Sequence, residues 1–321
     1  MKAIDIAKNG DASVLTLTDK PKPMPGPGQA LVRLKAAGIN FIDIYQRTGM
    51  YPIPVPYTPG LEGAGIVEEV GSGVTEVKPG DRVAYTGSIG SYAEYNLVKA
   101  YQLIPLPDDI SFEQGAAFPL QGMTAHYLLH EFYSIKPNDT ILVHAAAGGM
   151  GLLLVQWIKH LGGIVIGTVS TPEKAQLAKE AGADHTILYT EQDFVAETKR
   201  ITQNRGADYI IDGVGKTTFT KNLDAAKRRG HICIFGSASG SAEPIAPNIL
   251  QVKSLTIWGG SLFNYQDTRE EILMRANAVL KGMQEGWLKL KVDTVFSLDR
   301  AADAQRELES RKTTGKVILQ I

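Results

Sequence analysis

A stretch of very small residues between two apolar runs constrains the fold of this 321-residue chain more than any other part of it. The run Ile141–Val143 leads into the turn Ala145-Ala146-Ala147-Gly148-Gly149-Met150-Gly151, and the longer apolar run Leu152–Ile158 follows. The short run predicts a buried strand, and the run after the turn predicts a helix. The sequence therefore predicts the strand, turn and helix with which a dinucleotide-binding fold begins.

The turn is also a candidate phosphate-binding site. Because its side chains are tiny, the backbone can approach a pyrophosphate, and the first amides of the helix can point at it. Read as G-x-G-x-x-G, the frame is Ala146, Gly148 and Gly151, with alanine in place of the first glycine. The alternative is a tight turn without a ligand. The candidate cofactor-binding residues here are Ala147, Gly148, Gly149, Met150 and Gly151.

Strands and helices are expected to alternate after this turn, which is typical of a doubly wound parallel sheet. The apolar periodicity predicts strands at 140–144, 164–169, 185–188, 207–212, 230–236 and 254–259, with helices at 150–161, 172–181, 193–203 and 216–229. A helical pattern from Phe112 to near Lys136 precedes them. Later segments predict helices near 268–285 and 300–310 and strands near 292–297 and 316–320.

The residues before the parallel sheet predict a different kind of domain. Proline-rich segments and short strands with close turn signals are typical of a small barrel. The predicted fold is therefore α/β, with a doubly wound Rossmann sheet domain inserted in a mainly β, barrel-like domain. The predicted boundaries are 1–120 for the first part of the barrel-like domain, 121–262 for the dinucleotide-binding domain and 263–321 for the return.

Composition excludes several functional classes. The 33 Lys and Arg residues against 34 Asp and Glu residues leave a formal charge of −1, so we expect no binding of nucleic acid or of an anionic membrane surface. No apolar stretch approaches the roughly 20 residues that span a bilayer, and the first residues lack the apolar core of a signal peptide. A cytoplasmic protein is expected. The single cysteine, Cys233, lies in an apolar run, where a buried strand residue is expected.

The end of the predicted second strand bears on the kind of cofactor. NAD-binding folds carry an acid about 20 residues after the glycines, where it binds the ribose 2′-hydroxyl, but 164–171 contains no acid. Ser170 and Lys174 can instead bind a 2′-phosphate, although Lys174 is alternatively a solvated helix lysine and Glu173 argues against phosphate. NADPH is therefore predicted rather than NADH. The loop after a later strand adds Phe235, Gly236 and Ser237 as candidate cofactor contacts.

Segments along the whole chain resemble the medium-chain dehydrogenase/reductase superfamily. They are Pro59-Gly60-Leu61-Glu62-Gly63, Gly80-Asp81-Arg82-Val83, the turn at 145–151 and Gly315-Lys316-Val317. Within this superfamily, Ala36–Asp43 and Leu120–Ala125 are similar to segments of the zinc-free quinone oxidoreductases, the zeta-crystallin-like branch. The resemblance implies a GroES-like fold for the barrel-like domain.

No metal ligand is predicted. The related zinc alcohol dehydrogenases place a cysteine in the loop that here ends at Asn40 and a histidine where this chain has Leu61. With one cysteine elsewhere, neither a catalytic nor a four-cysteine zinc site can form. His144 is expected to be a satisfied core residue, and the pair His126 and His130 is expected at a solvated helix edge.

The absence of zinc ligands limits the acceptors that a nicotinamide cofactor can reduce. A quinone or an enone delocalises the incoming charge, whereas an unactivated ketone needs a Lewis acid or a strong proton donor. The predicted function is therefore an NADPH:quinone oxidoreductase, a zinc-independent enzyme that transfers hydride to a quinone or similar conjugated carbonyl. An enoyl-thioester or alkenal reductase is the alternative. A crystallin-like NADPH-binding structural protein or an RNA-binding protein is a more distant one.

The resemblance also implies roles for individual residues. Asn40, Tyr45 and Tyr51 would line the acceptor site and donate hydrogen bonds to its developing oxygen charge, unless the tyrosines are packing residues. Thr124 would face the nicotinamide, and its alternative is a hydrogen bond to the preceding helical turn. Tyr189 and Arg311 would line the 2′-phosphate pocket.

The end of the strand and helix series predicts the oligomeric state. Leu255–Trp258 is apolar, and a bare edge strand of this kind invites pairing with its twin. We therefore expect a homodimer, unless 260–266 cover the edge.

Overall fold

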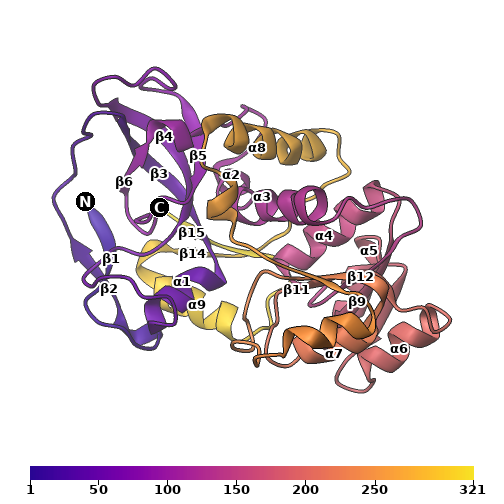
Figure 1. Cartoon of the computed structure of the whole chain (residues 1–321). Coiled ribbons are helices and arrows are strands. Elements are labelled where there is room, and N and C mark those ends of the chain that lie inside the picture. The colour runs from indigo at the N-terminus through magenta and orange to yellow at the C-terminus, as the bar shows by residue number, and fades with distance from the viewer. The chain divides into compact units, whose positions relative to one another are not determined.

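The computed structural model describes residues 1–321, which form two compact units. Unit 1 comprises Met1–Met123, Gln266–Asn277 and Leu290–Ile321. Unit 2 comprises Thr124–Tyr265 and Ala278–Lys289. The indigo and yellow ends of the chain in Figure 1 thus belong to the same unit, and most of unit 2 is inserted between them in the sequence.

Unit 1 is built on a seven-stranded sheet with the order β14-β15-β3-β4-β5-β7, in which β6 also pairs with β3. Its strands are β3 (Gln29–Ile39), β4 (Glu62–Val70), β5 (Arg82–Thr86), β6 (Tyr95–Lys99), β7 (Ile104–Pro105), β14 (Val292–Ser297) and β15 (Lys316–Gln320). Strands β1 (Lys2–Ile6) and β2 (Leu15–Asp19) form a separate antiparallel pair. The last strand, β15, lies inside the sheet because it pairs with β14 on one side and with β3 on the other.

The helices of unit 1 join its first and last segments. Helix α1 (Phe41–Thr48) follows β3 directly, α2 (Phe112–Gly115) follows β7, and α9 (Ala301–Glu309) precedes β15. The Arg47 guanidinium on α1 donates to Gln305 Oε1 at 2.7 Å and to Glu309 Oε1 at 2.6 Å, both on α9. The side chain of Arg47 is almost fully buried, so this ion pair and hydrogen bond fix α1 against the end of the chain.

Unit 2 confirms the predicted doubly wound parallel sheet. Its six strands have the order β10-β9-β8-β11-β12-β13, and every neighbouring pair is parallel. They are β8 (Thr140–Val143), β9 (Ile164–Val169), β10 (His185–Leu188), β11 (Ala207–Asp212), β12 (Ala226–Ile234) and β13 (Thr256–Gly259). The chain passes from β8 outward to β10 and then returns to β11, so the direction of winding reverses between β8 and β11. In such sheets a dinucleotide binds at this point.

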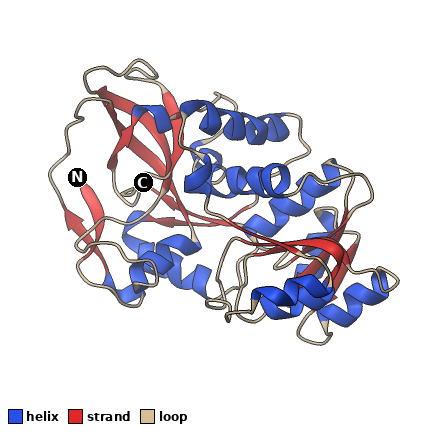
Figure 2. Cartoon of the chain, in the orientation of Figure 1, coloured by secondary structure: helices blue, strands red, loops and turns tan.

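Helices cover the parallel sheet, as the blue elements around the red strands of unit 2 show in Figure 2. They include α4 (Gly149–His160), α5 (Pro172–Glu180), α6 (Phe194–Ile201) and α7 (Phe219–Ala225). Helix α8 (Arg269–Gln284) begins in unit 1 and ends in unit 2. No helix in the structure has the length and apolar character needed to cross a bilayer.

Two helix predictions were wrong in extent. The continuous helix predicted from Phe112 is broken into α2, α3 (Pro119–Tyr127) and a π-helical turn at Leu128–Phe132. Proline disfavours helical geometry in the residue before it, which explains the break before Pro119. The helix predicted at 216–229 covers only Phe219–Ala225, because the following residues belong to β12, where Ala226 pairs with Ala207 of β11.

Candidate functional site

The glycine turn of unit 2 lies between β8 and α4, as predicted. Ala145 has a φ of 53°, and its carbonyl oxygen accepts a hydrogen bond from the Gly148 N–H at 2.9 Å. A Cβ on Gly151 would collide with the same carbonyl oxygen, so this position requires glycine. No side chain caps α4, which leaves the first helical amides for an anion. The turn therefore fits a pyrophosphate.

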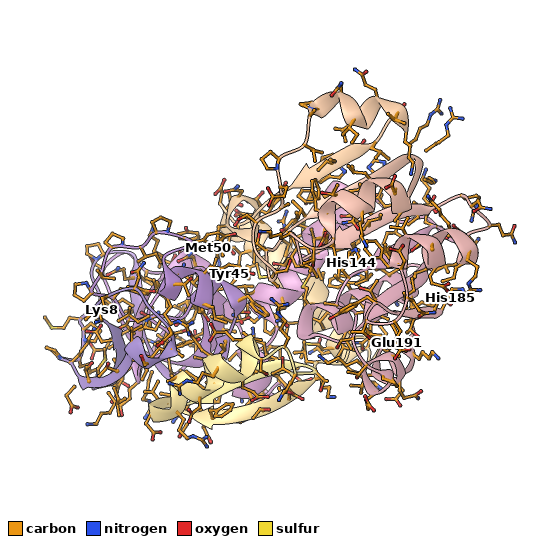
Figure 3. All side chains as sticks on the ribbon, turned by 90° about the horizontal axis from the view of Figure 1, so that it is seen from below. Lys8, Tyr45, Met50, His144, His185 and Glu191 are labelled. Atoms are coloured by element: carbon orange, nitrogen blue, oxygen red, sulfur yellow. The ribbon has the colours of Figure 1, made fainter.

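A chain of hydrogen bonds, most of them buried, holds the start of this turn. The Ala145 N–H donates to Thr168 Oγ1 at 3.3 Å, and the same oxygen lies 3.0 Å from His144 Nδ1. On the other side of the ring, His144 Nε2 lies 2.8 Å from Asn222 Oδ1. Because the Asn222 Nδ2 donates to Asp212, its Oδ1 must accept the proton of His144 Nε2. His144 is thus a satisfied core residue, as predicted, and Figure 3 labels it within unit 2.

The chain of hydrogen bonds ends at a buried carboxylate. Asp212 Oδ1 accepts from the Val214 N–H at 2.7 Å and from the Gly215 N–H at 3.1 Å. Its Oδ2 accepts from the Thr218 hydroxyl and from Asn222, each at 2.7 Å. The chain therefore connects the ends of β9, β8 and β11 across the point where the winding of the sheet reverses. It fixes the glycine turn and the 213–215 loop relative to one another.

The candidate phosphate-binding residues of unit 2 gather after β9 and β10. Ser170 directly follows β9, and Lys174 lies in the first turn of α5, where its N–H donates to Thr171 Oγ1 at 3.3 Å. Tyr189 follows β10, and its side chain is half exposed. A hydrogen bond from its own backbone N–H lowers the pKa of Glu173, so this acid stays ionised in the same turn. Arg311 belongs to unit 1, where it follows α9 with a φ of 59°.

The remaining cofactor candidates lie on one loop and one helix of unit 2. The Phe235 ring packs on Gly213, where an added Cβ would lie 2.7 Å from the ring. Gly236 and Ser237 continue this loop, which is tied to the β11 loop by the Ala238 N–H donating to the Gly213 carbonyl at 3.1 Å. Thr124 lies on α3. Its hydroxyl makes no hydrogen bond to the preceding helical turn, which was the alternative to a role at the nicotinamide.

In unit 1, Asn40 lies in a cluster that sequence analysis missed. Lys316 Nζ donates to Asn40 Oδ1 at 2.6 Å and to Glu62 Oε2 at 2.5 Å, and Asn40 Nδ2 donates to the same Glu62 oxygen at 2.9 Å. Glu62 Oε1 accepts from the Leu120 N–H at 2.7 Å. All three side chains are buried. The only sequence signal was that Glu62 and Lys316 both lie in motifs of the family resemblance.

The two candidate tyrosines lie close to each other beyond Asn40. Tyr45 is on α1 and buried, and its ring meets the more exposed Tyr51 ring edge-on at a centroid distance of 5.2 Å. Figure 3 labels Tyr45 beside Met50, the residue that precedes Tyr51. The Tyr51 N–H also donates to the Tyr45 carbonyl at 3.0 Å. The structure therefore brings the two tyrosines together.

A buried carboxyl group supports the backbone of Asn40. Asp43 Oδ2 accepts from the Asn40 N–H at 2.9 Å and from the Tyr92 hydroxyl at 2.8 Å, whereas Oδ1 has no partner. Complete burial raises the pKa of Asp43 to about 7. Asp43 thus holds Asn40, the residue that precedes α1, although the charge of its own carboxylate is poorly solvated.

The residues at the positions of the zinc ligands of the related branch do not fit a zinc ion. Asn40 and Leu61 stand at the two ligand positions of the zinc branch, and the Lys316 ammonium already contacts the Asn40 oxygen. No group of three His, Cys, Asp or Glu side chains in the structure could hold a metal. Burial raises the pKa of Cys233 to about 12, which keeps it a thiol. His130 is exposed as predicted, but His126 is buried, and both rings pack edge-on against Trp157.

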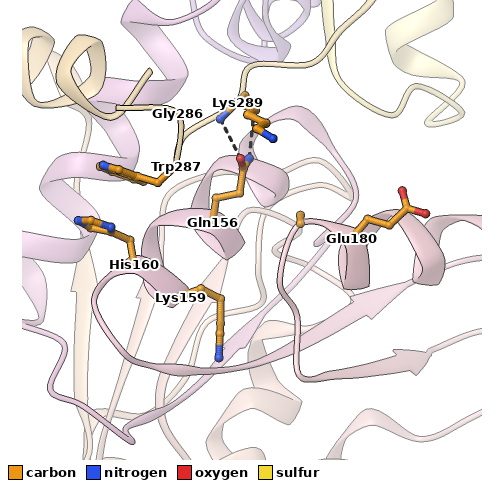
Figure 4. Close-up of a pocket in the computed structure, with 8 residues that line it drawn as sticks. Gln156, Lys159, His160, Glu180, Gly286, Trp287 and Lys289 are labelled. Atoms are coloured by element: carbon orange, nitrogen blue, oxygen red, sulfur yellow. Dashed lines mark hydrogen bonds between the residues drawn. The ribbon is translucent and has the colours of Figure 1, made fainter. Parts of the chain in front are cut away.

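A separate pocket of about 390 Å³ lies in unit 2 (Figure 4). It is lined by the C-terminal ends of α4 and α5, which lie at the opposite edge of the sheet from the glycine turn. His160 stacks on Trp287 at 4.0 Å, and Lys159 pairs with Asp184. The Gln156 side chain accepts from the Lys289 N–H at 2.8 Å and donates to its carbonyl at 3.1 Å. These contacts tie 286–289 to α4 and are no part of the candidate site.

Comparisons with known proteins agree with the two-part architecture. Residues 26–108 match the alcohol dehydrogenase GroES-like domain, and residues 149–277 match the zinc-binding dehydrogenase domain. The quinone oxidoreductase of Pseudomonas aeruginosa is 43% identical over 99% of both chains. A 2-haloacrylate reductase of Burkholderia is 42% identical over 92% of this chain and 91% of its own. The crystal structure of the Escherichia coli quinone oxidoreductase complexed with NADPH superposes with a TM-score of 0.98, at 41% identity and full coverage of both chains.

Proposed function

Because this chain belongs to the quinone oxidoreductase branch of the medium-chain dehydrogenase/reductase superfamily, we propose that it is an NADPH-dependent, zinc-independent reductase of quinones or similar conjugated carbonyls. One observation supports this function independently of the family name. The positions that hold zinc ligands in the related branch are occupied by Asn40 and Leu61, and an ammonium group contacts Asn40. A site without a Lewis acid favours acceptors that delocalise the charge of an added hydride.

The cofactor supplies the hydride when it is bound, and this chain supplies its binding and orientation. The amides at 147–151 bind the pyrophosphate, and the buried chain through His144 keeps their turn in place. Ser170, Lys174, Tyr189 and Arg311 bind the 2′-phosphate. Thr124 faces the nicotinamide, and the loop at 235–237 contacts the cofactor. The lack of an acid between 164 and 171 supports the assignment of the 2′-phosphate site.

Asn40, Tyr45 and Tyr51 serve the acceptor. Their amide and hydroxyl groups donate hydrogen bonds to the oxygen on which charge develops, and such donors lower the barrier most when they are held in place beforehand. The fixed cluster around Asn40 supports the role of that residue. We also propose that the dinucleotide-binding domain comprises residues 121–262 and that the remaining residues form the barrel-like domain, as the sequence predicts.

A second candidate function is reduction of a conjugated C=C bond. The observation that favours it is the 2-haloacrylate reductase of Burkholderia, which is almost as similar to this chain as the quinone oxidoreductase of Pseudomonas aeruginosa. The two functions share the cofactor site and differ in the acceptor. They also share the absence of zinc ligands.

The test is oxidation of NADPH by the purified protein with a panel of quinones, enones and enoyl-thioesters. We expect turnover with quinones, a preference for NADPH over NADH, and full activity after exhaustive dialysis against EDTA. Product analysis separates the two functions, because an enone returns with a saturated C=C bond and a quinone returns reduced. Binding of NADPH without turnover of any acceptor would instead support a passive binder. Activity that is lost on dialysis and restored by zinc would contradict the proposed chemistry.

We also propose a homodimer joined through β13. This strand is the edge of the parallel sheet, and its residues Thr256, Ile257 and Trp258 are partly exposed. The preceding segment exposes Ile249 and, most strongly, Val252. An unpaired apolar edge is a natural surface for a two-fold contact. The cytoplasmic location expected from the sequence stays a prediction.

A further inference from the structure

The cluster of Asn40, Glu62 and Lys316 follows from strand register. The end of β3 lies between β15 and β4, with Val317 paired to Ile39 on one side and Gly63 paired to Ala37 on the other. Continuing each register by one residue places Lys316 opposite Asn40 and Glu62 opposite Gly38. A Cβ at position 38 would collide with the Ala116 carbonyl oxygen and with Glu62 Oε2, and it would lie 2.8 Å from Lys316 Cε. Glycine at this position therefore makes room for a buried ion pair.

The ion pair determines which way the Asn40 carboxamide faces. Its Oδ1 accepts from the Lys316 ammonium at 2.6 Å, and its Nδ2 donates to the Glu62 carboxylate at 2.9 Å. A flipped amide would set its nitrogen against an ammonium and its oxygen against a carboxylate, so only one orientation is compatible with these partners. The second hydrogen of Nδ2 has only the Gly38 carbonyl nearby, at the long distance of 3.4 Å.

The same contact makes Asn40 a stronger donor. A positive charge bound to the carbonyl oxygen of an amide withdraws electron density from its nitrogen, and hydrogen bonds polarise one another in this way inside a protein. The Lys316 and Glu62 side chains are 3% and 0% exposed, so water screens little of this effect. The chain thus supplies, through Lys316, a fixed cation beside residue 40.

We propose that Lys316 is a positioning residue for the reduction, which orients and polarises Asn40 so that its Nδ2 donates to the acceptor oxygen as negative charge develops there. This inference rests on the proposed function. The class of acceptor that depends on it is an enone or another carbonyl whose charge gathers on one oxygen. A quinone depends on it less, because the charge is delocalised over the ring and the second oxygen.

The experiment compares the wild-type enzyme with the double variant Glu62→Gln/Lys316→Met, which removes both charges of the pair together and leaves no orphaned ion. With an enone we expect kcat to fall about 100-fold, as for loss of an oxyanion donor. With a quinone we expect a fall of less than about tenfold, and the NADPH dissociation constant should stay within about twofold. Lys291→Met, on an exposed lysine that contacts the Thr314 hydroxyl, is the matched control and should leave all three values unchanged.

A double-mutant cycle shows whether Lys316 acts through Asn40. Asn40→Ala should reduce enone activity, and adding Glu62→Gln/Lys316→Met to it should cause no further fall, because the polarised amide is already absent. Glu62→Gln/Lys316→Gln, which keeps donors in the site but no charge and leaves no orphaned ion, provides a second variant if the first double variant folds poorly. It should show the same difference between enone and quinone.

Several outcomes would overturn the inference. One is an equal loss of kcat for every acceptor, accompanied by a lower melting temperature of the variant. Another is a loss of enone activity that adds up in the double-mutant cycle. A third is enone turnover that is unchanged in the variants. A wild-type enzyme that turns over no acceptor would contradict the proposed function itself and is recognised before any variant is made.

Discussion

Asp43 illustrates what burial does to a single carboxyl group. Its folded pKa is raised to about 7, above the usual value of an aspartate, so it stabilises the fold most below about pH 4 and this contribution is lost as the pH rises through 7. Asp43→Asn removes the titration. The free energy of unfolding of the variant should therefore improve relative to wild type by about 2 kcal/mol between pH 5 and pH 8. Urea denaturation at the two pH values measures this.

The control for this prediction is Asp109→Asn, which changes an exposed aspartate. A difference between Asp43→Asn and wild type that is the same at pH 5 and pH 8 would show that Asp43 is ionised throughout this range.

Lys174 carries the prediction on cofactor choice. A charge-assisted contact to the 2′-phosphate contributes roughly 1.5–3 kcal/mol, so Lys174→Ala should weaken NADPH binding by about one to two orders of magnitude and leave NADH nearly unchanged. Fluorescence titration with both cofactors measures this. Lys179→Ala, on the exposed last turn of the same helix, is the control. Equal losses for NADPH and NADH in Lys174→Ala would place the phosphate elsewhere.

Sequence analysis predicted the local structure around some candidate residues and missed the partners of others for a physical reason. The turn at 145–151 is local, so its small side chains indicate its geometry directly. Lys316 lies 276 positions from Asn40 and 254 from Glu62, and only the pairing of β15 with β3 brings them together. The partners of His144 were hidden for the same reason, although its place in the core was predicted.

At the level of strands and helices, the buried chain from Thr168 to Asp212 acts as one element of the cofactor crevice. Thr168→Val keeps the shape of the side chain but removes the acceptor of the Ala145 N–H and the partner of His144 Nδ1. His144 Nδ1 is then a buried acceptor without a partner, which costs about 1–3 kcal/mol, so we expect a lower melting temperature and NADPH binding weaker by about tenfold. Calorimetry and cofactor titration measure the two effects.

Thr16→Val on the exposed face of β2 is the matched control, since it makes the same change outside unit 2. If Thr168→Val lowers stability but binds NADPH as tightly as wild type, the chain of hydrogen bonds supports the core and not the glycine turn.

The periodicity of apolar residues predicted the bounds of some strands and helices correctly and those of others wrongly. Strands β9, β10, β11, β14 and β15 have the bounds that the sequence predicted. The predicted helix at 216–229 was too long, because Ala226 already pairs with Ala207 of β11, and residues 227–230 form an irregularity in β12 before His231 pairs with Tyr209. Pairing with a distant strand outweighs local propensity in such cases.

For the whole molecule, the edge strand β13 carries the prediction of a dimer. Ile257→Lys places a charge on this edge and should raise the dimer dissociation constant by about tenfold or more. Val252→Lys, at a residue that is 80% exposed, should do the same with less effect on the fold. Val295→Lys on β14, the edge strand of the other sheet, is the control and should leave the dimer intact. Sedimentation at micromolar concentration distinguishes the states, and a wild-type monomer would contradict the prediction.

The interior place of β15 has a consequence for how the chain is made. Unit 2 is complete in sequence by Lys289, whereas the sheet of unit 1 lacks an inner strand, and Glu62 lacks its counter-charge, until residues 316–320 have been synthesised. Domains generally fold as units while the ribosome is still at work. On a nascent chain the nucleotide-binding half can therefore close first, and a premature stop codon before Lys316 would release a protein with one finished half and one open sheet.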